Sequence, residues 1–161
     1  MAIKEKPVEK QAESKVREST ILWPDLPKMV CRAVGRRKEA SARVRLYKMD
    51  KDSKSTQKDL INGKLVKQWF SLKTLQDKAT RPYEIAGLEG KFFFTAIVEG
   101  GGITGQADAV ALGLSRCLAK EGDEIRALLS KAGLMRRDPR EVERKHIFHY
   151  KARRAPQWSK R

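Results

Sequence analysis

The chain has 161 residues, a length that suits one domain with extensions, and it is strongly basic. Its 36 Lys and Arg face 20 Asp and Glu, giving a formal charge of +16 and a pI near 10.1. Such an excess favours a polyanionic partner such as nucleic acid. The sequence shows no long apolar run and no signal-peptide core, and its two cysteines are too few for a disulfide framework. We therefore expect a cytoplasmic protein without a membrane partner.

Composition divides the chain into three parts. Residues 1–30 alternate Lys and Glu, which is typical of a flexible charged extension. Residues 31–143 show strand patterns followed by helix patterns, which predicts a globular α+β domain with a small, mostly antiparallel sheet packed on helices. Residues 144–161 hold seven Lys or Arg and no acid, and their hydrophobic periodicity is lost. We expect an extended basic C-terminal tail there.

The first clear strand pattern covers residues 40–49, where small apolar residues alternate with larger polar ones. Successive side chains of a strand point to opposite faces. Val44 is therefore expected to face the core, with Arg43, Arg45 and Tyr47 on the other face. That second face can offer two guanidinium groups to a ligand.

Two further patterns complete the predicted sheet. A polar insert at 50–59 is followed by Asn62-Gly63 between two apolar pairs, which predicts a tight hairpin. Residues 91–99 are apolar on both faces, which favours a central strand.

Four helices are predicted from hydrophobic spacing and terminal residues. Asp138-Pro139-Arg140-Glu141 has the form of a capping box with proline at the first helical position. The predicted helices run from a cap at Ser71 to a stop at Pro82, over Ala107–Leu118, from a cap at Asp123 to Gly133, and briefly onward from Asp138.

A glycine-rich turn, Gly100-x-Gly102-x-x-Gly105, lies between the predicted strand and helix. It matches the dinucleotide fingerprint, but such a unit needs a second parallel strand after its helix, and here another helix follows. Two other interpretations stay open. Gly100, Gly101 and Gly102 could receive an RNA phosphate at the helix N-terminus, or they could permit close packing of strand and helix.

The residues do not point to a metal centre or an active site. Cys31, Cys117, His146 and His149 lack the local pairing of zinc ligands, and no nucleophile–base motif is visible. We therefore expect no metal, no cofactor and no enzymatic activity.

The tail combines cations with aromatic residues, a composition that suits RNA. Trp158 is expected to stack on a base, and Phe148 to hold the tail against the domain. Ordering residues 150–161 costs on the order of 12–24 kcal/mol of backbone entropy. The five cations there return roughly 8–15 kcal/mol, so we expect the tail to become ordered only where RNA surrounds it.

The chain resembles bacterial-type small-subunit ribosomal protein nine over residues 31–161. Smaller matches at Gly133-Leu134, Arg137-Asp138 and residues 142–145 support this resemblance. The principal motifs, in order, are Gly35-Arg36-Arg37-Lys38 before Ser41-Ala42-Arg43-Val44, Gly100-Gly101-Gly102-Ile103-Thr104-Gly105-Gln106-Ala107, and Lys151-Ala152-Arg153-Arg154-Ala155-Pro156-Gln157-Trp158-Ser159-Lys160-Arg161. Residues 1–30, the 50–59 insert and Trp158, where Phe is more usual, depart from the family pattern.

The resemblance implies a fold like the second domain of ribosomal protein S-five and a structural, non-catalytic role in the small ribosomal subunit. The implied partners are rRNA of the subunit head, neighbouring head proteins and the anticodon stem-loop of P-site tRNA. A free-standing nucleic-acid-binding regulator is the alternative. The implied rRNA contacts are Arg36, Arg37, Lys38, Arg43, Arg45, Arg144, Lys145, Lys151, Arg153 and Arg154, and the tRNA-proximal residues are Trp158, Ser159, Lys160 and Arg161.

Overall fold

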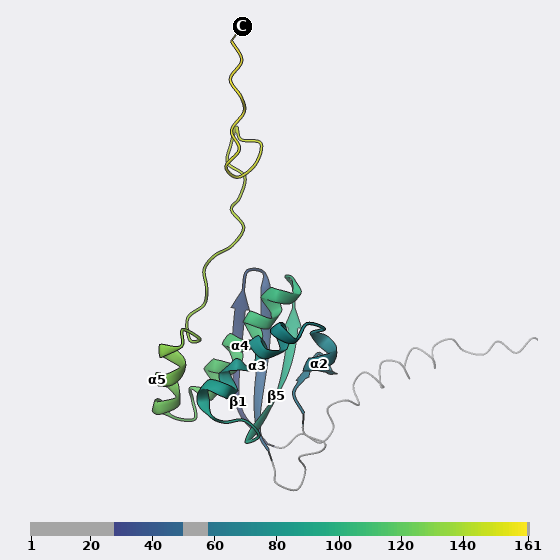
Figure 1. Cartoon of the computed structure of the whole chain (residues 1–161), viewed down its shortest axis with the longest axis vertical. Coiled ribbons are helices and arrows are strands. Elements are labelled where there is room, and N and C mark those ends of the chain that lie inside the picture. The colour runs from purple at the N-terminus through teal and green to yellow at the C-terminus, as the bar shows by residue number, and fades with distance from the viewer. Residues whose placement is uncertain (1–27, 50–57, 161) are drawn as a thin grey trace, which may run out of the picture.

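The computed structural model describes residues 28–49 and 58–160, and it confirms the α+β class. Figure 1 shows a twisted sheet with helices on one face and the C-terminal segment extending away from the domain. The strands are β1 (Met29–Arg37), β2 (Ala40–Lys48), β3 (Leu60–Ile61), β4 (Lys64–Leu65) and β5 (Phe92–Glu99). The helices are α2 (Val66–Trp69), α3 (Lys73–Ala86), α4 (Ile103–Leu118) and α5 (Asp123–Lys131).

The five strands found in residues 28–49 and 58–160 lie in the order β1-β2-β5-β3-β4. All neighbouring pairs are antiparallel except β3 and β5, which are parallel. β5 therefore lies inside the sheet, which confirms the predicted central strand. Strand β1 is missing from the predicted elements. Its burial alternates from Cys31 onward, but its inward positions include Gly35 and Arg37, which hide this alternation in the hydrophobicity of the sequence. It pairs with β2 through a turn at Lys38-Glu39.

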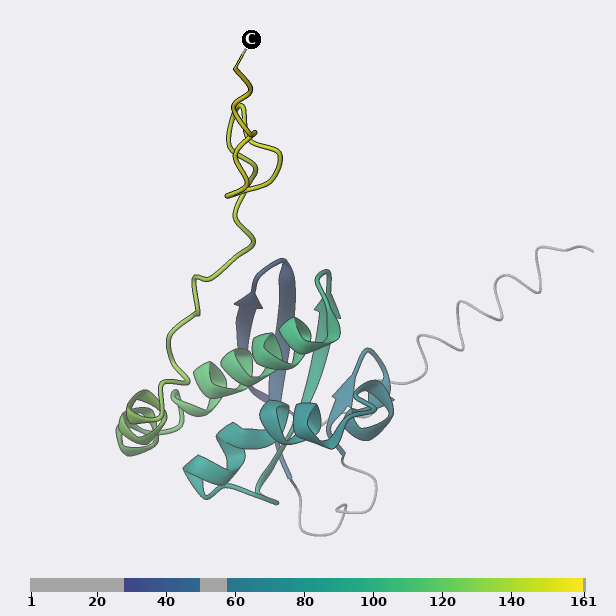
Figure 2. The ribbon, with the colours of Figure 1, turned by 45° about the horizontal axis from the view of Figure 1, so that its top comes forward.

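Helix α4 lies directly on the β1–β2 hairpin, and Figure 2 shows α3 and α4 across the same face of the sheet. Two glycines permit this close approach. A Cβ atom at Gly35 would lie 1.9 Å from the carbonyl oxygen of Ala109, and one at Gly113 would lie 2.7 Å from a methyl group of Val44. Both contacts are too short for any larger side chain, so the backbone of the helix touches the sheet.

The predicted hairpin at Asn62-Gly63 is confirmed. Both residues have left-handed backbone angles, with φ of 49° and 77°, as a tight two-residue turn requires. The Asn62 side chain also accepts a hydrogen bond from the Val98 amide at 2.8 Å and donates one to the Val98 carbonyl at 2.9 Å. This side chain therefore fastens the short hairpin to β5.

The prediction for α3 is wrong at both ends. Leu72, not Ser71, occupies the N-cap position, and the helix continues through Pro82 until Gly87 takes a left-handed φ of 61°. A proline inside a helix removes one backbone hydrogen bond. Here Pro82 and Tyr83 belong to the buried face of α3, so burial of that face carries the helix past the proline.

Helix α4 includes the predicted Ala107–Leu118 segment but begins earlier, at Ile103. In α5, Gly122 is the N-cap, so the prediction that Asp123 caps the helix is wrong. Asp123 lies in the first turn, where a negative charge favours the helix dipole. The predicted stop at Gly133 is confirmed by its φ of 73° and by a 3.0 Å hydrogen bond from the Leu134 amide to the Leu129 carbonyl.

The short helix predicted from Asp138 does not form. The Asp138 carboxylate accepts a hydrogen bond from the Arg140 amide at 3.0 Å, two residues onward, which makes a local turn instead of a helix cap. Arg37 also holds this carboxylate, and that long-range contact competes with the capping geometry. Within the part of the chain that is described, no helix is both long and apolar enough to cross a membrane.

Candidate nucleic-acid interface

The uncovered face of the sheet carries a group of arginines, which we call the open face. In the β1–β2 register, Arg32 lies opposite Arg45 and Val34 opposite Arg43, so these side chains share one side of the sheet. The three arginines are exposed, while Val44 faces the helices and is buried, which confirms the predicted alternation.

Arg43 and Arg45 border a shallow hollow of about 170 Å³ with Thr95 and Ile97 of β5. Arg43 pairs with the Glu99 carboxylate, and both side chains are more than half exposed. Arg45 forms no ion pair among the described residues. An exposed pair contributes little to stability and can exchange its carboxylate for a phosphate, so both guanidinium groups can serve an anionic ligand.

Tyr47, the third side chain expected on the open face, is buried. Its ring stacks on Phe93 with centroids 5.2 Å apart. The sequence pattern placed it on the correct face, but the aromatic neighbour on β5 covers it.

The cationic side chains at the β1–β2 turn point to different sides of the sheet. Arg36 and Lys38 are exposed, and Lys38 occupies the turn with a left-handed φ of 51°. Arg37 points to the helix-covered side, where its side chain is only 13% exposed. It lies 3.7 Å from the Asp108 carboxylate and 3.0 Å from that of Asp138. The structure thus separates Arg37 from the other cations of its motif.

Arg37 also holds the chain that leads from α5 to the tail. Its guanidinium donates a hydrogen bond of 2.7 Å to the Arg140 carbonyl. The neighbouring Asp138 carboxyl has a pKa held well below its usual range, chiefly by its hydrogen bonds from Arg140 and with a further contribution from Arg37. One side chain of β1 therefore holds the chain where it leaves the domain.

The glycine turn after β5 packs on the β1–β2 turn. Gly100 and Gly101 have left-handed φ angles of 71° and 62°. Cβ atoms there would lie 2.8 Å from the Glu39 carbonyl oxygen and 2.8 Å from the Ala40 amide nitrogen. This geometry supports the close-packing interpretation. Gly102 has open space around it and caps α4, which leads to α5 and not to the parallel strand that a dinucleotide unit requires.

The tail projects from the domain as Figure 1 shows, with few contacts of its own. Arg153 pairs with Glu143, the Tyr150 amide donates to the Arg154 carbonyl at 2.8 Å, and the Arg154 guanidinium lies 6.0 Å from the centre of the Tyr150 ring. These contacts close a loop within the tail. The other tail residues that the sequence predicts as contacts are exposed, and within the described residues the charged ones among them form no ion pair. They are Arg144, Lys145, Lys151, Arg154, Trp158, Ser159 and Lys160.

The expected anchoring of the tail by Phe148 is wrong. The Phe148 side chain is 90% exposed and so lies outside the core. Trp158 is 80% exposed, which leaves its ring accessible for stacking. Arg161, residues 1–27 and residues 50–57 of the insert lie outside the described residues.

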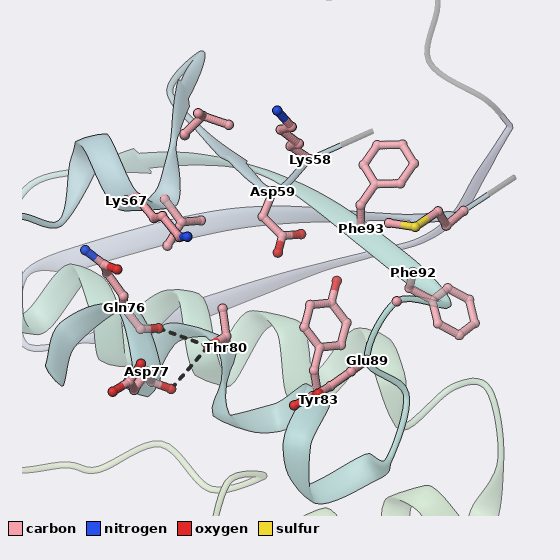
Figure 3. A pocket seen from close by; sticks show the side chains of 14 residues that line it. Lys58, Asp59, Lys67, Gln76, Asp77, Thr80, Tyr83, Glu89, Phe92 and Phe93 are labelled. Carbon is pink, nitrogen blue, oxygen red and sulfur yellow. Dashed lines mark hydrogen bonds between the residues drawn. The ribbon is translucent and has the colours of Figure 1, made fainter. Parts of the chain in front are cut away.

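A larger hollow has a volume of about 580 Å³. It lies between α3 on one side and, on the other, the residues just before β3, the β4–α2 segment and the start of β5. Figure 3 shows the Asp59 carboxyl and the Tyr83 hydroxyl pointing toward one another inside it. Asp59 accepts a 2.9 Å hydrogen bond from the Phe94 amide, and burial raises its pKa to about 6. The Tyr83 hydroxyl has no hydrogen-bond partner among the described residues. Sequence reasoning missed this pair, because the two residues come together only through packing of α3 on the sheet.

The cysteines and histidines do not assemble into a metal centre in the described ranges. Cys31 and Cys117 are buried free thiols, and burial raises the pKa of Cys117. The rings of His146 and His149 meet edge to face with centroids 6.0 Å apart. Over residues 28–49 and 58–160, no three side chains of His, Cys, Asp or Glu gather as metal ligands would.

Comparison with known proteins places the chain in one family. Residues 35–161 match the family described as ribosomal protein S9/S16. The chain is 49% identical over 128 residues to small ribosomal subunit protein uS9 of Bifidobacterium animalis subsp. lactis, covering 79% of this chain and 75% of that protein. It is 44% identical over 130 residues to the uS9 protein of Renibacterium salmoninarum, covering 80% and 74%. The chain therefore belongs to the ribosomal protein S9/S16 family.

Proposed function

We propose that this protein binds rRNA in the head of the small ribosomal subunit through its open face and its tail, and that the tail end approaches P-site tRNA. Family membership makes it a structural, non-enzymatic constituent of the small ribosomal subunit, a cytoplasmic ribonucleoprotein that acts in translation. Its partners in that assembly are rRNA and neighbouring ribosomal proteins. Our proposal adds two things to this family role: the residues that make each RNA contact, and the contact with P-site tRNA.

The open face carries this proposal. Arg32 and Arg45 lie opposite each other in the register, and Arg43 is two residues from Arg45 on the same strand. Helices cover the other side of the sheet, so the exposed guanidinium groups serve no packing role there. A row of such groups presents several positive charges to one RNA strand, and each can donate two parallel hydrogen bonds to one phosphate.

The tail supports a second contact surface farther from the domain. Lys151 and Arg154 are exposed, and Arg153 is matched only by an exposed Glu143. Cations of this kind neutralise phosphates with little specificity for sequence. We assign these three to rRNA, together with Arg144 and Lys145, and the segment Trp158–Arg161 to the neighbourhood of the tRNA.

Sucrose-gradient fractionation of native cell extract tests the assignment to the ribosome. The protein should co-sediment with small subunits and leave them only at high salt. Sedimentation mainly at the top of the gradient would favour a free-standing regulator that uses the same basic surfaces.

Crosslinking to P-site tRNA tests the proposed contact between the tail end and tRNA. A photoreactive crosslinker at Lys160 in reconstituted small subunits should attach to tRNA bound in the P site and not to subunits without it. Crosslinking to rRNA alone would remove the tRNA contact from the proposal and leave rRNA binding intact.

A further inference from the structure

A second basic hollow lies on the helix side of the domain, at the root of the tail. It has a volume of about 250 Å³ and forms where the end of β1, the helices α3 and α4, and the chain after α5 meet. Its lining includes five cationic side chains and two carboxylates, a surplus of three positive charges. We call it the root hollow. The sequence motifs of the family resemblance include only part of it, because α3 contributes two of its cations.

The two carboxylates of the root hollow are already neutralised inside the domain. Arg37 contacts both Asp108 and Asp138, and the Lys78 ammonium lies 3.4 Å from Asp108. Arg37 is largely buried, which strengthens its attraction to the two acids. The acids therefore have little negative charge to offer to any other cation.

Three cations of the lining stay without an acidic partner in the described part of the chain. Arg36, Arg81 and Arg136 are exposed and take part in none of the ion pairs. Arg81 follows Lys78 by one helical turn, so both project from the same side of α3. Arg81 and Arg136 come from α3 and from the chain after α5, and the fold alone brings them to one place. Arg36 borders the same hollow from β1, although its side chain starts from the opposite side of the strand from that of Arg37.

We propose that the root hollow binds a phosphate of the rRNA backbone, on an RNA segment different from the one that lies on the open face. This inference rests on the proposed rRNA-binding function and adds a second site to it. A phosphate is favoured over a base because, among the residues that the structure describes, the lining contains no aromatic side chain on which a base could stack. Guanidinium groups are also the side chains best shaped to hold a phosphate through paired hydrogen bonds.

The position of the root hollow links it to the tail. Asp138 lines the hollow and begins the segment that Arg37 holds, so an RNA strand bound here lies beside the point where the tail departs. The bound strand then supports the first residues of the tail on their way to the rest of the rRNA. A single protein thus brings two RNA segments together across its domain.

Directed cleavage of rRNA tests the location. An iron chelate is attached to a cysteine introduced by Glu84→Cys, one turn beyond Arg81, or by Val34→Cys on the open face. Both positions are exposed, whereas the native Cys31 and Cys117 are buried. Each labelled full-length protein is reconstituted into bacterial small subunits, and hydroxyl radicals are generated.

We expect both probes to cleave rRNA, at nucleotide sets that do not coincide. Cleavage from position 34 alone would overturn the root-hollow site and leave the proposed function standing. Cleavage from neither position would count against the proposed function itself.

Charge variants test whether the root hollow contributes affinity. Arg81→Gln with Arg136→Gln should lower affinity for purified bacterial small-subunit rRNA about tenfold and reduce the slope of log affinity against log salt by about 1 to 2. The matched control, Lys64→Gln with Lys67→Gln, removes the same charge from exposed residues of β4 and α2. Equal losses in the two pairs would overturn the site, because they would reflect net charge alone. Urea unfolding of each variant establishes that the fold is unchanged.

Discussion

The sheet domain and the tail differ in how far their side chains are buried from solvent. In the domain, Phe70, Phe94 and Leu114 have no exposed surface, and α4 touches the sheet through glycines. Between residues 139 and 160, no residue is buried. Burying one large apolar side chain contributes about 1.5–3 kcal/mol, whereas an exposed ion pair contributes about 0–1 kcal/mol. The domain can therefore determine its own shape, and the tail depends on what surrounds it.

The sharpest test of the domain is the contact between α4 and the hairpin. Gly35→Ala places a methyl group against the Ala109 carbonyl, where the free space is far too small. We expect the free energy of unfolding in urea to fall by about 3 kcal/mol or more, because backbone on both sides has to move. Gly102→Ala is the control, since its Cβ would meet nothing within 4 Å, and it should cost under about 1 kcal/mol. Equal losses at the two glycines would contradict this account of the packing.

The buried Asp59 carboxyl makes the stability of the domain sensitive to pH. Burial raises its pKa from the usual 3.8 to about 6, so the folded state binds an additional proton between those pH values. The free energy of unfolding therefore falls as pH rises through this window. Asp59→Asn keeps an oxygen that can accept from the Phe94 amide and should stabilise the protein at pH 7 by up to about 3 kcal/mol.

Urea titrations from pH 4 to pH 8 measure this effect. The wild-type protein should lose stability across the window, and Asp59→Asn should lose less. Asp77→Asn, a change at an exposed carboxyl of the same hollow, should preserve the wild-type profile. A wild-type profile that rises with pH and is unaltered by Asp59→Asn would rule out the assignment.

The open face should contribute affinity without contributing to stability. Arg43→Ala with Arg45→Ala should weaken binding to small-subunit rRNA roughly 10- to 100-fold and reduce the salt slope by about 2. Urea unfolding should change by less than about 1 kcal/mol, because both side chains are exposed. The control is Lys64→Ala with Lys67→Ala, which removes equal charge elsewhere. An unchanged salt slope would remove the open face from the interface.

The smallest thermodynamic effect is expected at the end of the tail. Deleting Trp158–Arg161 should change the free energy of unfolding by less than about 0.5 kcal/mol and leave assembly into small subunits largely intact. Retention of P-site tRNA, measured by filter binding, should decline. Loss of the truncated protein from the particles would show instead that the tail end supplies affinity for rRNA.

Local sequence patterns were reliable where neighbouring residues decide the structure. The alternation around Val44 predicted which side of β2 is buried, and Asn62-Gly63 predicted a tight turn. The stop at Gly133 also depends on one backbone angle that glycine adopts readily. The predictions failed where a distant contact overrides the local preference. Pro82 lies inside a helix because its face is buried, and Asp138 does not cap a helix because Arg37 and Arg140 hold its carboxylate.

The sequence by itself determined the basic charge, the α+β class, the exposed arginines of β2 and the family resemblance, because these depend on composition, periodicity and motifs. Only the tertiary structure decided which cations act together. It turned Arg37 inward to two carboxylates and brought Arg36, Arg81 and Arg136 from three segments to one hollow. Charge is a property of each residue, whereas the field that a phosphate meets depends on distances between residues far apart along the chain.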